Sequence, residues 1–345
     1  MAHLTEEHLQ RALQHYYSLI ILLIGVLLVS CSPKQEVEKG GIDGEILNTK
    51  TGLVFLTESI SPFESACGKF PAKQTFKLDS LDVFFHQQDF DEGYYTFEAD
   101  EVTLPVYFVP GKKLSIDLDV RKPYEKPSFG GGMKYEARYL FDRKRELARI
   151  QLQSKTAISF SEQQYVSWVT SFRSALDSIL LLYITNHPRG SKTFMEQESV
   201  SNYYLAATYL ESYPRLHALA VDSLSFKPSP SFYNQLDEIE YPNDQASDNA
   251  QYVEYVLTRI HERTFSQKMT DSKTYWLEQK LSEAENTLID TTIYNVALFN
   301  MAREMMSMEP SAKRDLLYSR ARGLISSRAV RENLPDTIPN LISEP

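Results

Sequence analysis

The sequence is poor in cysteine. Only two Cys occur in 345 residues, at positions 31 and 67, and they form no Cys-x-x-Cys pair. A disulfide framework needs several cysteines in the folded body, and a dithiol redox cycle needs two thiols close together. This chain alone therefore has no such framework and cannot run such a cycle. Cys67, in the segment Glu64–Lys69, is interpreted as an inert thiol, with mixed-disulfide formation as the alternative.

Positive charge is in the minority. There are 36 Lys and Arg against 46 Asp and Glu, which gives a formal net charge of −10. The acidic residues are spread along the chain rather than gathered in one tail. Binding to DNA or RNA requires a basic patch or stripe, so we expect no nucleic-acid partner.

Recognisable catalytic and metal-binding motifs are also missing. The histidines after residue 31 have no His-x-x-x-His spacing, no Gly-x-Ser-x-Gly elbow occurs, and Asp89–Glu92 lacks the spacing of a calcium loop. We expect no enzyme activity, no cofactor and no metal site. The residues weighed and set aside are His86, His187, His217 and His261; Asp237, Glu238 and Glu240, interpreted as a solvated helix end; Met301, Met305, Met306 and Met308, interpreted as helix packing; and Gly130–Gly132, interpreted as a linker.

The longest apolar run, Leu19–Val29, has about eleven residues, which suits a signal-peptide core and is shorter than the roughly 20 residues of a membrane-spanning helix. It closes with Leu28-Val-Ser-Cys31, which resembles the lipobox of bacterial lipoproteins. That resemblance implies cleavage before Cys31 and lipidation of its thiol, and hence a membrane partner. An ordinary Cys ending a signal or membrane-anchor helix is the alternative. Glu6 and Glu7 also depart from the net positive start that a signal peptide normally has.

Between Gly40 and about Val120 the hydrophobic pattern has a period of two. The clearest example is Leu114–Val120, with Ser115, Asp117 and Asp119 on the opposite face. Pro110-Gly111 suits a type II turn, so we expect Val106–Val109 and Leu114–Val120 to form a hairpin. About six strands at this spacing predict a small antiparallel β-sandwich.

After Met133 the period changes to 3.6. The first helix is expected to present Ala137, Leu140 and Phe141. The second is expected to begin with a capping box of Ser161 and Gln164 and to end at 186–190. Further helices are expected at 198–212, ending at Tyr213-Pro214, and at 215–224, 230–239, 248–263 with Asp248 as cap, 272–289, 292–307 and 311–326.

The expected fold class is therefore α+β, a small antiparallel β-sandwich followed by an all-α helical domain. The expected organisation is a lipoprotein signal peptide (1–30), a tether (31–40), a β-sandwich domain (41–121), a linker (122–132), a helical domain (133–330) and a C-terminal tail (331–345).

Several local sequences together resemble one protein family. They are Gly40-Gly-Ile-Asp-Gly44, Pro105-Val-Tyr-Phe-Val-Pro-Gly111 and Phe129-Gly-Gly-Gly-Met-Lys-Tyr-Glu-Ala-Arg-Tyr-Leu140. With the lipobox, they resemble envelope lipoproteins whose N-terminal β-domain of unknown function precedes a thioredoxin-like, TlpA-type module. In that family the chemistry belongs to the C-terminal module with its Trp-Cys-x-x-Cys. This sequence contains no such motif, which implies a truncated gene or a family member without the enzyme.

Two functions follow as hypotheses. The first is a non-catalytic, anchoring or accessory lipoprotein of a thioredoxin-like thiol-disulfide system, with an envelope thioredoxin-like protein as partner. The second is a helical binding lipoprotein for an envelope glycan or peptide, suggested by the aromatic content of 12%. In both, the protein is anchored by Cys31 in the cell envelope, and Ser32 favours the outer membrane of a Gram-negative bacterium. Exposed faces of Trp168, Trp276 and the Tyr residues would favour the second hypothesis.

Overall fold

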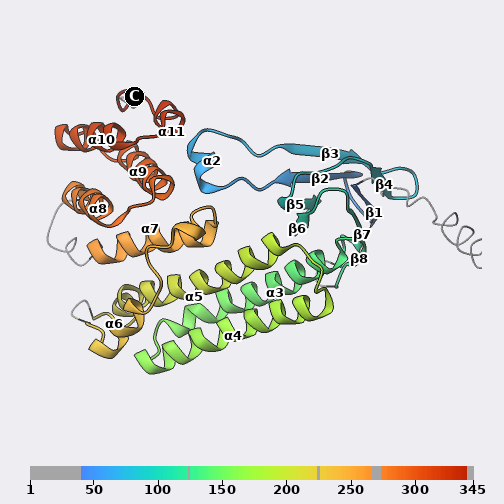
Figure 1. The fold of residues 1–345 in the computed structure, drawn as a ribbon, viewed down its shortest axis with the longest axis horizontal. Helices are drawn as coiled ribbons and strands as arrows, with labels where there is room; N and C mark the ends of the chain where they lie inside the picture. The colour runs from blue at the N-terminus through green and yellow to red at the C-terminus, as the bar shows by residue number, and fades with distance from the viewer. Residues whose placement is uncertain (1–39, 123–124, 224–225, 266–272, 340–345) are drawn as a thin grey trace, which may run out of the picture.

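The computed structural model describes residues 40–122, 125–223, 226–265 and 273–339. The signal peptide, Cys31 and the tether lie outside these ranges. Within them the chain forms two four-stranded sheets followed by a series of helices (Figure 1). The strands are β1 (Gly41–Leu47), β2 (Leu53–Glu58), β3 (Lys73–Lys77), β4 (Val83–His86), β5 (Gly93–Ala99), β6 (Val102–Phe108), β7 (Lys113–Asp119) and β8 (Ser128–Gly131).

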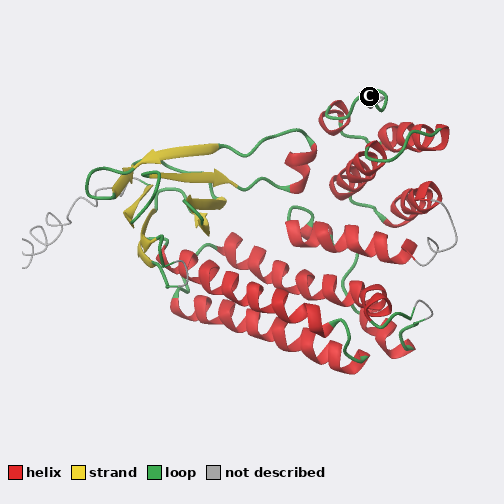
Figure 2. Cartoon of the chain, turned by 180° about the vertical axis from the view of Figure 1, so that it is seen from behind, coloured by secondary structure: helices red, strands yellow, loops and turns green. Residues whose placement is uncertain are grey.

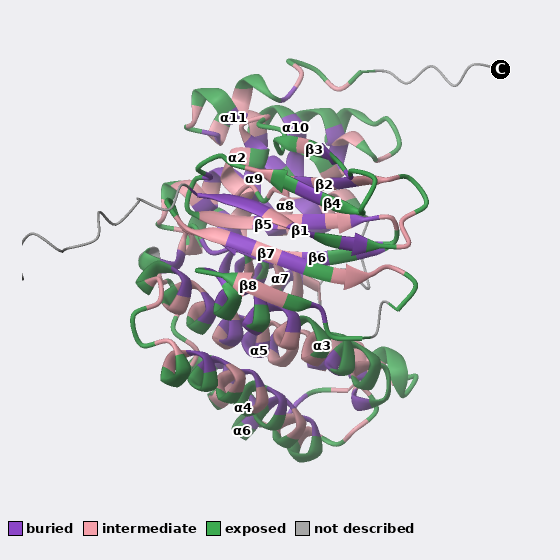
Figure 3. Ribbon diagram, turned by 90° about the vertical axis from the view of Figure 1, so that its right-hand side faces the viewer, coloured by how far each residue is buried: buried purple, intermediate pink, exposed green. Residues whose placement is uncertain are grey.

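The two sheets share one hydrophobic core. The first has the strand order β4-β1-β7-β8 and the second β3-β2-β5-β6. Ile42 and Ile116 from the first sheet, and Leu56 and Phe97 from the second, are all buried in the same cluster. In Figure 3 buried and exposed residues alternate along several strands, as the period of two predicts. The expectation of a purely antiparallel arrangement is wrong, because β1 pairs with β7 in parallel.

The expected hairpin of Val106–Val109 with Leu114–Val120 is also wrong. The turn itself is present, since Gly111 has a φ of 74° and the Lys112 N–H donates to the Val109 carbonyl at 3.1 Å. However, β6 pairs with β5, whereas β7 pairs with β1 and β8, so Pro110-Gly111 carries the chain from one sheet to the other. A tight turn reverses the chain in either case, and only the packing decides whether the flanking strands pair.

Part of the expected linker is a strand. Residues 128–131 form β8, which pairs with β7 at the edge of the first sheet. Gly131 has a φ of 77°, and a Cβ there would lie 2.3 Å from the Lys113 carbonyl oxygen. The glycines therefore allow close approach of two backbones.

The helices are α2 (Pro62–Ala66), α3 (Lys134–Ala157), α4 (Glu162–Asn186), α5 (Lys192–Ala220), α6 (Pro230–Asp237), α7 (Ala250–Phe265), α8 (Lys273–Thr287), α9 (Thr291–Met306), α10 (Ala312–Leu324) and α11 (Arg328–Glu332). The long helices α3, α4 and α5 lie side by side, and α7 to α11 form a second group farther from the sheets (Figures 1 and 2). None of the described helices is long and apolar enough to cross a membrane.

The start of α3 and the short helix α2 both help to join the sheets to the helices. Met133, Ala137 and Phe141, at the start of α3, are buried in the core of the sheets. The connection between β2 and β3 reaches across to the distant helices and carries α2 at its tip (Figure 2). Ala66 of α2 is buried in the core of α7 to α10, and the Asn333 side-chain amide donates to the Ala66 carbonyl at 3.1 Å.

Sequence patterns located most helices correctly and two features incorrectly. The capping box of Ser161 and Gln164 is present at the start of α4. In contrast, Pro214 does not end a helix but lies inside the continuous α5, which packs against both α4 and α7. Asn249, rather than Asp248, caps α7, because its side-chain oxygen accepts from the Tyr252 N–H at 3.2 Å.

Candidate functional site

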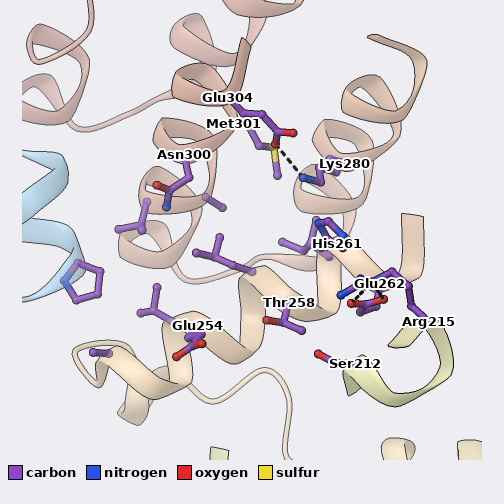
Figure 4. Close-up of a pocket in the computed structure, with 17 residues that line it drawn as sticks. Ser212, Arg215, Glu254, Thr258, His261, Glu262, Lys280, Asn300, Met301 and Glu304 are labelled. Carbon is purple, nitrogen blue, oxygen red and sulfur yellow. Dashed lines mark hydrogen bonds and ion pairs between the residues drawn. The ribbon is translucent and has the colours of Figure 1, made fainter. Parts of the chain in front are cut away.

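A pocket of about 480 Å³ lies between α7 and α9 (Figure 4). We name it the helical groove. It is lined by α7 between Ala250 and Glu262 and by α9 between Val296 and Glu304, with Lys280 of α8, Ser212 and Arg215 of α5, and Pro62 of α2. Five helices, distant in sequence, therefore contribute to one cavity.

The floor of the helical groove is apolar. Val253 and Ile260 of α7 face Val296, Ala297 and Met301 of α9, and each of these side chains is buried. Val253 and Ile260 are seven positions apart and Ala297 and Met301 four, so on each helix they lie on one face. The same side chains hold the two helices in the fold, and the half-buried Leu257 of α7 is one of the apolar lining residues that stay partly accessible.

One ion pair lies at the α5 side of the groove. The Arg215 Nε donates to the two Glu262 carboxylate oxygens at 2.8 and 3.0 Å, and only 8% of the Glu262 side chain is exposed. Burial raises the pKa of Glu262 to about 7, and the hydrogen bond from Arg215 opposes this shift only in part. Arg215 also stacks over the Phe265 ring, 5.4 Å from its centre.

A second ion pair lies at the α8 side. The Lys280 Nζ is 2.9 Å from a Glu304 carboxylate oxygen and 3.7 Å from the centre of the Trp276 ring. Lys280 interrupts an apolar stripe that contains Leu277, Leu281 and Ala284, and only 10% of its side chain is exposed. Both cations of the groove are thus held by a carboxylate and an aromatic ring.

Other polar side chains of the groove form fewer ion pairs and hydrogen bonds with the described residues. Glu254 is exposed and accepts a hydrogen bond from the Gln251 amide at 2.9 Å, but it forms no ion pair with a described residue. Ser212, Thr258 and Asn300 line the cavity, and within the described part of the chain their side chains form no hydrogen bond. These groups are available to a ligand.

The wall behind the groove contains a further buried pair. Arg259 donates to the Glu211 carboxylate at 3.0 Å and to the Tyr255 hydroxyl at 2.8 Å. Burial raises the pKa of Glu211, against the attraction of Arg259. This contact and the pair of Arg215 and Glu262 connect α5 to α7 at two places along the helices. Together they position one side of the groove.

The four histidines weighed in the sequence lie in four different places. His86 stacks on Phe76, His187 lies 3.6 Å from a Glu136 oxygen, the His217 Nδ1 lies 2.8 Å from the Ile158 carbonyl oxygen, and His261 lines the groove. Among the described residues no group of three or more His, Cys, Asp or Glu is arranged to hold a metal ion.

The other residues considered from the sequence do not converge either. The Asp89 carboxylate accepts from the Gly40 and Gly111 N–H groups, so it holds the start of β1 beside the turn at Pro110-Gly111. Asp237, Glu238 and Glu240 are exposed at and just after the end of α6. Cys67 caps the C-terminus of α2 and is half-buried against the distal helices. Met301 and Met305 are buried, and Met301 lines the groove.

Sequence reasoning missed Arg215, Glu262, Lys280 and Glu304. They are separated by up to 89 positions and belong to no known short motif. One signal was present, since Lys280 lies in the middle of an apolar helical stripe, and buried charges are rare unless they are paired.

Comparisons with family models, with curated protein sequences and with solved structures yield no match. The function must therefore be argued from the geometry of the helical groove and from the sequence itself.

Proposed function

We propose that this chain is a membrane-anchored lipoprotein of the bacterial cell envelope, whose helical part is a non-catalytic binding module. The observation that carries the binding role is the helical groove, with its apolar floor, its two paired cations and its free polar side chains. An apolar cavity with a few placed polar groups is the usual form of a ligand site. We also interpret the two sheets with their common core as the expected sandwich, with one parallel strand pair.

A binding role is favoured over catalysis by what lines the groove. The hydroxyls of Ser212 and Thr258 are its candidate nucleophiles, and neither forms a hydrogen bond to a described residue. Glu262, a candidate base, is held by Arg215. A nucleophile that contacts its base is the usual sign of covalent catalysis. The described lining residues include no such contact, and we therefore favour a binding role.

The binding role is tested by ligand-induced stabilisation. Fractions of an envelope extract are added to the purified chain, and the melting temperature is measured, because a ligand that binds only the folded state raises it. Asn300→Trp fills the groove from an exposed position on α9, and Arg303→Trp is the matched control outside the groove. We expect a shift in the wild type and in Arg303→Trp, and none in Asn300→Trp. A shift that persists in Asn300→Trp, or no shift with any fraction, contradicts the binding role.

The anchor is tested separately, by fractionation. Cys31→Ser is expected to move the protein from the membrane pellet to the soluble fraction, because acyl chains on Cys31 would supply about 0.8 kcal/mol per buried CH₂. Cys67→Ser is the control and is expected to remain in the membrane. If Cys31→Ser remains there too, the chain is not held by a lipid on that residue.

Participation in a thioredoxin-like thiol-disulfide system stays a prediction, based on the family resemblance. Cys67 is the one thiol among the described residues, and it is half-buried at the end of α2. Co-purification of an envelope thioredoxin-like protein with the intact chain, but not with a chain carrying a disrupted α2 contact, would support this function. The absence of any such partner would exclude it.

A further inference from the structure

We propose that the ligand of the helical groove is a short extended peptide segment that carries a basic side chain. This inference rests on the proposed binding function and specifies its ligand. It uses three properties of the groove: its length, its lack of aromatic ring faces and its charge.

The groove follows most of the length of α7. Its α7 wall runs from Ala250 to Glu262, which at 1.5 Å per residue is about 18 Å. An extended peptide advances about 3.3 Å per residue, so five or six residues match this wall. The volume of about 480 Å³ suits such a segment with part of its side chains directed outward.

The polar side chains of the groove match a peptide backbone. Ser212 lies on α5, Thr258 on α7 and Asn300 on α9, so donors and acceptors surround the apolar floor on several sides (Figure 4). An extended segment lying along α7 would pack an apolar side chain against the half-buried Leu257, while its N–H and C=O groups meet the polar residues. Apolar contacts combined with a few placed polar groups are the usual form of a ligand site.

The lining is unsuited to a glycan, because sugars are usually held by stacking on aromatic rings. No Phe, Tyr or Trp is among the described lining residues, and the nearby rings of Phe265 and Trp276 carry Arg215 and Lys280 on their faces. A second hollow, of about 520 Å³ between α4 and α5, contains Tyr203 and Tyr204. There Arg173 covers the Tyr203 ring at 4.7 Å, and Tyr204 is 1% exposed.

The charge of the groove favours a cation. Arg215 and Lys280 are already paired with Glu262 and Glu304, which leaves the exposed carboxylate of Glu254 without a counter-ion among the described residues. The net charge of −10 also attracts basic rather than acidic ligands over longer distances. A lysine or arginine side chain of the bound segment would meet Glu254 at the α2 end of the groove.

The test measures binding of defined probes to the full chain by fluorescence anisotropy. The probes are labelled hexapeptides of alternating Val and Ser with one Lys, the same peptides with Glu in place of Lys, and cellohexaose as an unlabelled competitor. We expect saturable binding of the Lys peptides only. Glu254→Lys is expected to weaken it about tenfold, because like charges repel, and Glu196→Gln, on the exposed side of α5, is expected to leave it unchanged.

The outcomes separate this inference from the function on which it rests. If the Lys and Glu peptides bind equally, or if Glu254→Lys has no effect, the basic side chain is not recognised and the inference fails. If cellohexaose stabilises the chain and Asn300→Trp abolishes that effect, the groove is a binding site but its ligand is a glycan. If the peptides bind equally well to Asn300→Trp, they bind elsewhere and the inference is overturned.

Discussion

In the helical groove, the protonation of Glu262 depends on the fold. Its carboxyl has an ordinary pKa of 4.5 and a pKa of about 7 in the folded chain, because burial disfavours the charged form. The folded state therefore binds this proton more tightly than the unfolded state. The resulting contribution to stability is complete below about pH 4.5 and is lost as the pH rises through 7.

Glu262→Gln removes this titration, since the amide keeps the shape and can accept from Arg215. We expect the variant to gain stability relative to the wild type as the pH rises from 4.5 to 8, by roughly 2–3 kcal/mol in total. Urea unfolding at several pH values measures the difference, and Glu196→Gln, at an exposed position of α5, is the control variant. If the difference between Glu262→Gln and the wild type is flat, Glu262 is not buried as a charge.

For single residues, the sequence predicts the surroundings of some side chains and not of others. The acids of 237–240 were correctly interpreted as a solvated helix end, because three carboxylates within four positions favour solvent unless cations pair with them. The roles of Arg215 and Glu262 could not be predicted, because each depends on a partner 47 positions away and on a helix packing that no local pattern specifies.

Among the elements, the five-residue helix α2 connects the sheets both to the distal helices and to the groove. It belongs to the connection between two strands, yet Ala66 is 1% exposed in the core of the distal helices and Pro62 lines the groove. The capping box of Ser61 and Glu64 stabilises it at its start, so that such a short helix keeps its shape. The element therefore links the sheets to the binding site.

Ala66→Asp places a charge in this contact. We expect a loss of about 3 kcal/mol or more, because a carboxylate at this position would be buried in a cluster of apolar side chains. Hydrogen exchange should then become faster in both α2 and α9. Ser65→Asp, at the exposed neighbouring position, is the control and should leave exchange in α9 unchanged. Slow exchange in α9 of the Ala66→Asp variant would mean that α2 does not support the distal helices.

The elements were predictable where local chemistry decides the outcome. The box of Ser161 and Gln164 and the turn at Pro110-Gly111 depend on neighbouring residues and are both present. The expected break at Pro214 failed because the missing N–H costs one hydrogen bond, whereas packing of α5 against α4 and α7 is distributed over its whole length. The hairpin failed for a similar reason, since strand pairing is decided by contacts distant in sequence.

For the whole molecule, the distribution of the cores predicts how it unfolds. The start of α3 belongs to the core of the sheets and its end to the core with α4 and α5. Residues of α5 belong to three different cores, and α2 connects the sheets to one of these three, the core of the distal helices. Within the described residues, α2, α3 and α5 therefore each connect parts of the molecule that would otherwise be separate.

We therefore expect one cooperative unfolding transition rather than separate ones for the β-part and the helices, despite the domain organisation expected from the sequence. Circular dichroism at a helical wavelength and tyrosine fluorescence should give coincident midpoints in urea. Two separated transitions would show that α2 and α3 do not couple the parts. The boundary at 122–132 was expected from its Pro and Gly content. That content indicates local backbone conformation, but it gives no information about contacts between residues that are distant in sequence.

The position of β1 within its sheet has a mechanical consequence. It is an inner strand, with β4 on one side and β7 on the other. If the chain is anchored through Cys31, the pull of the membrane enters the folded body at β1. Two ladders of hydrogen bonds hold this strand, whereas an edge strand is held by one. The body therefore resists the loss of its anchored strand while it is attached to the membrane at a single point.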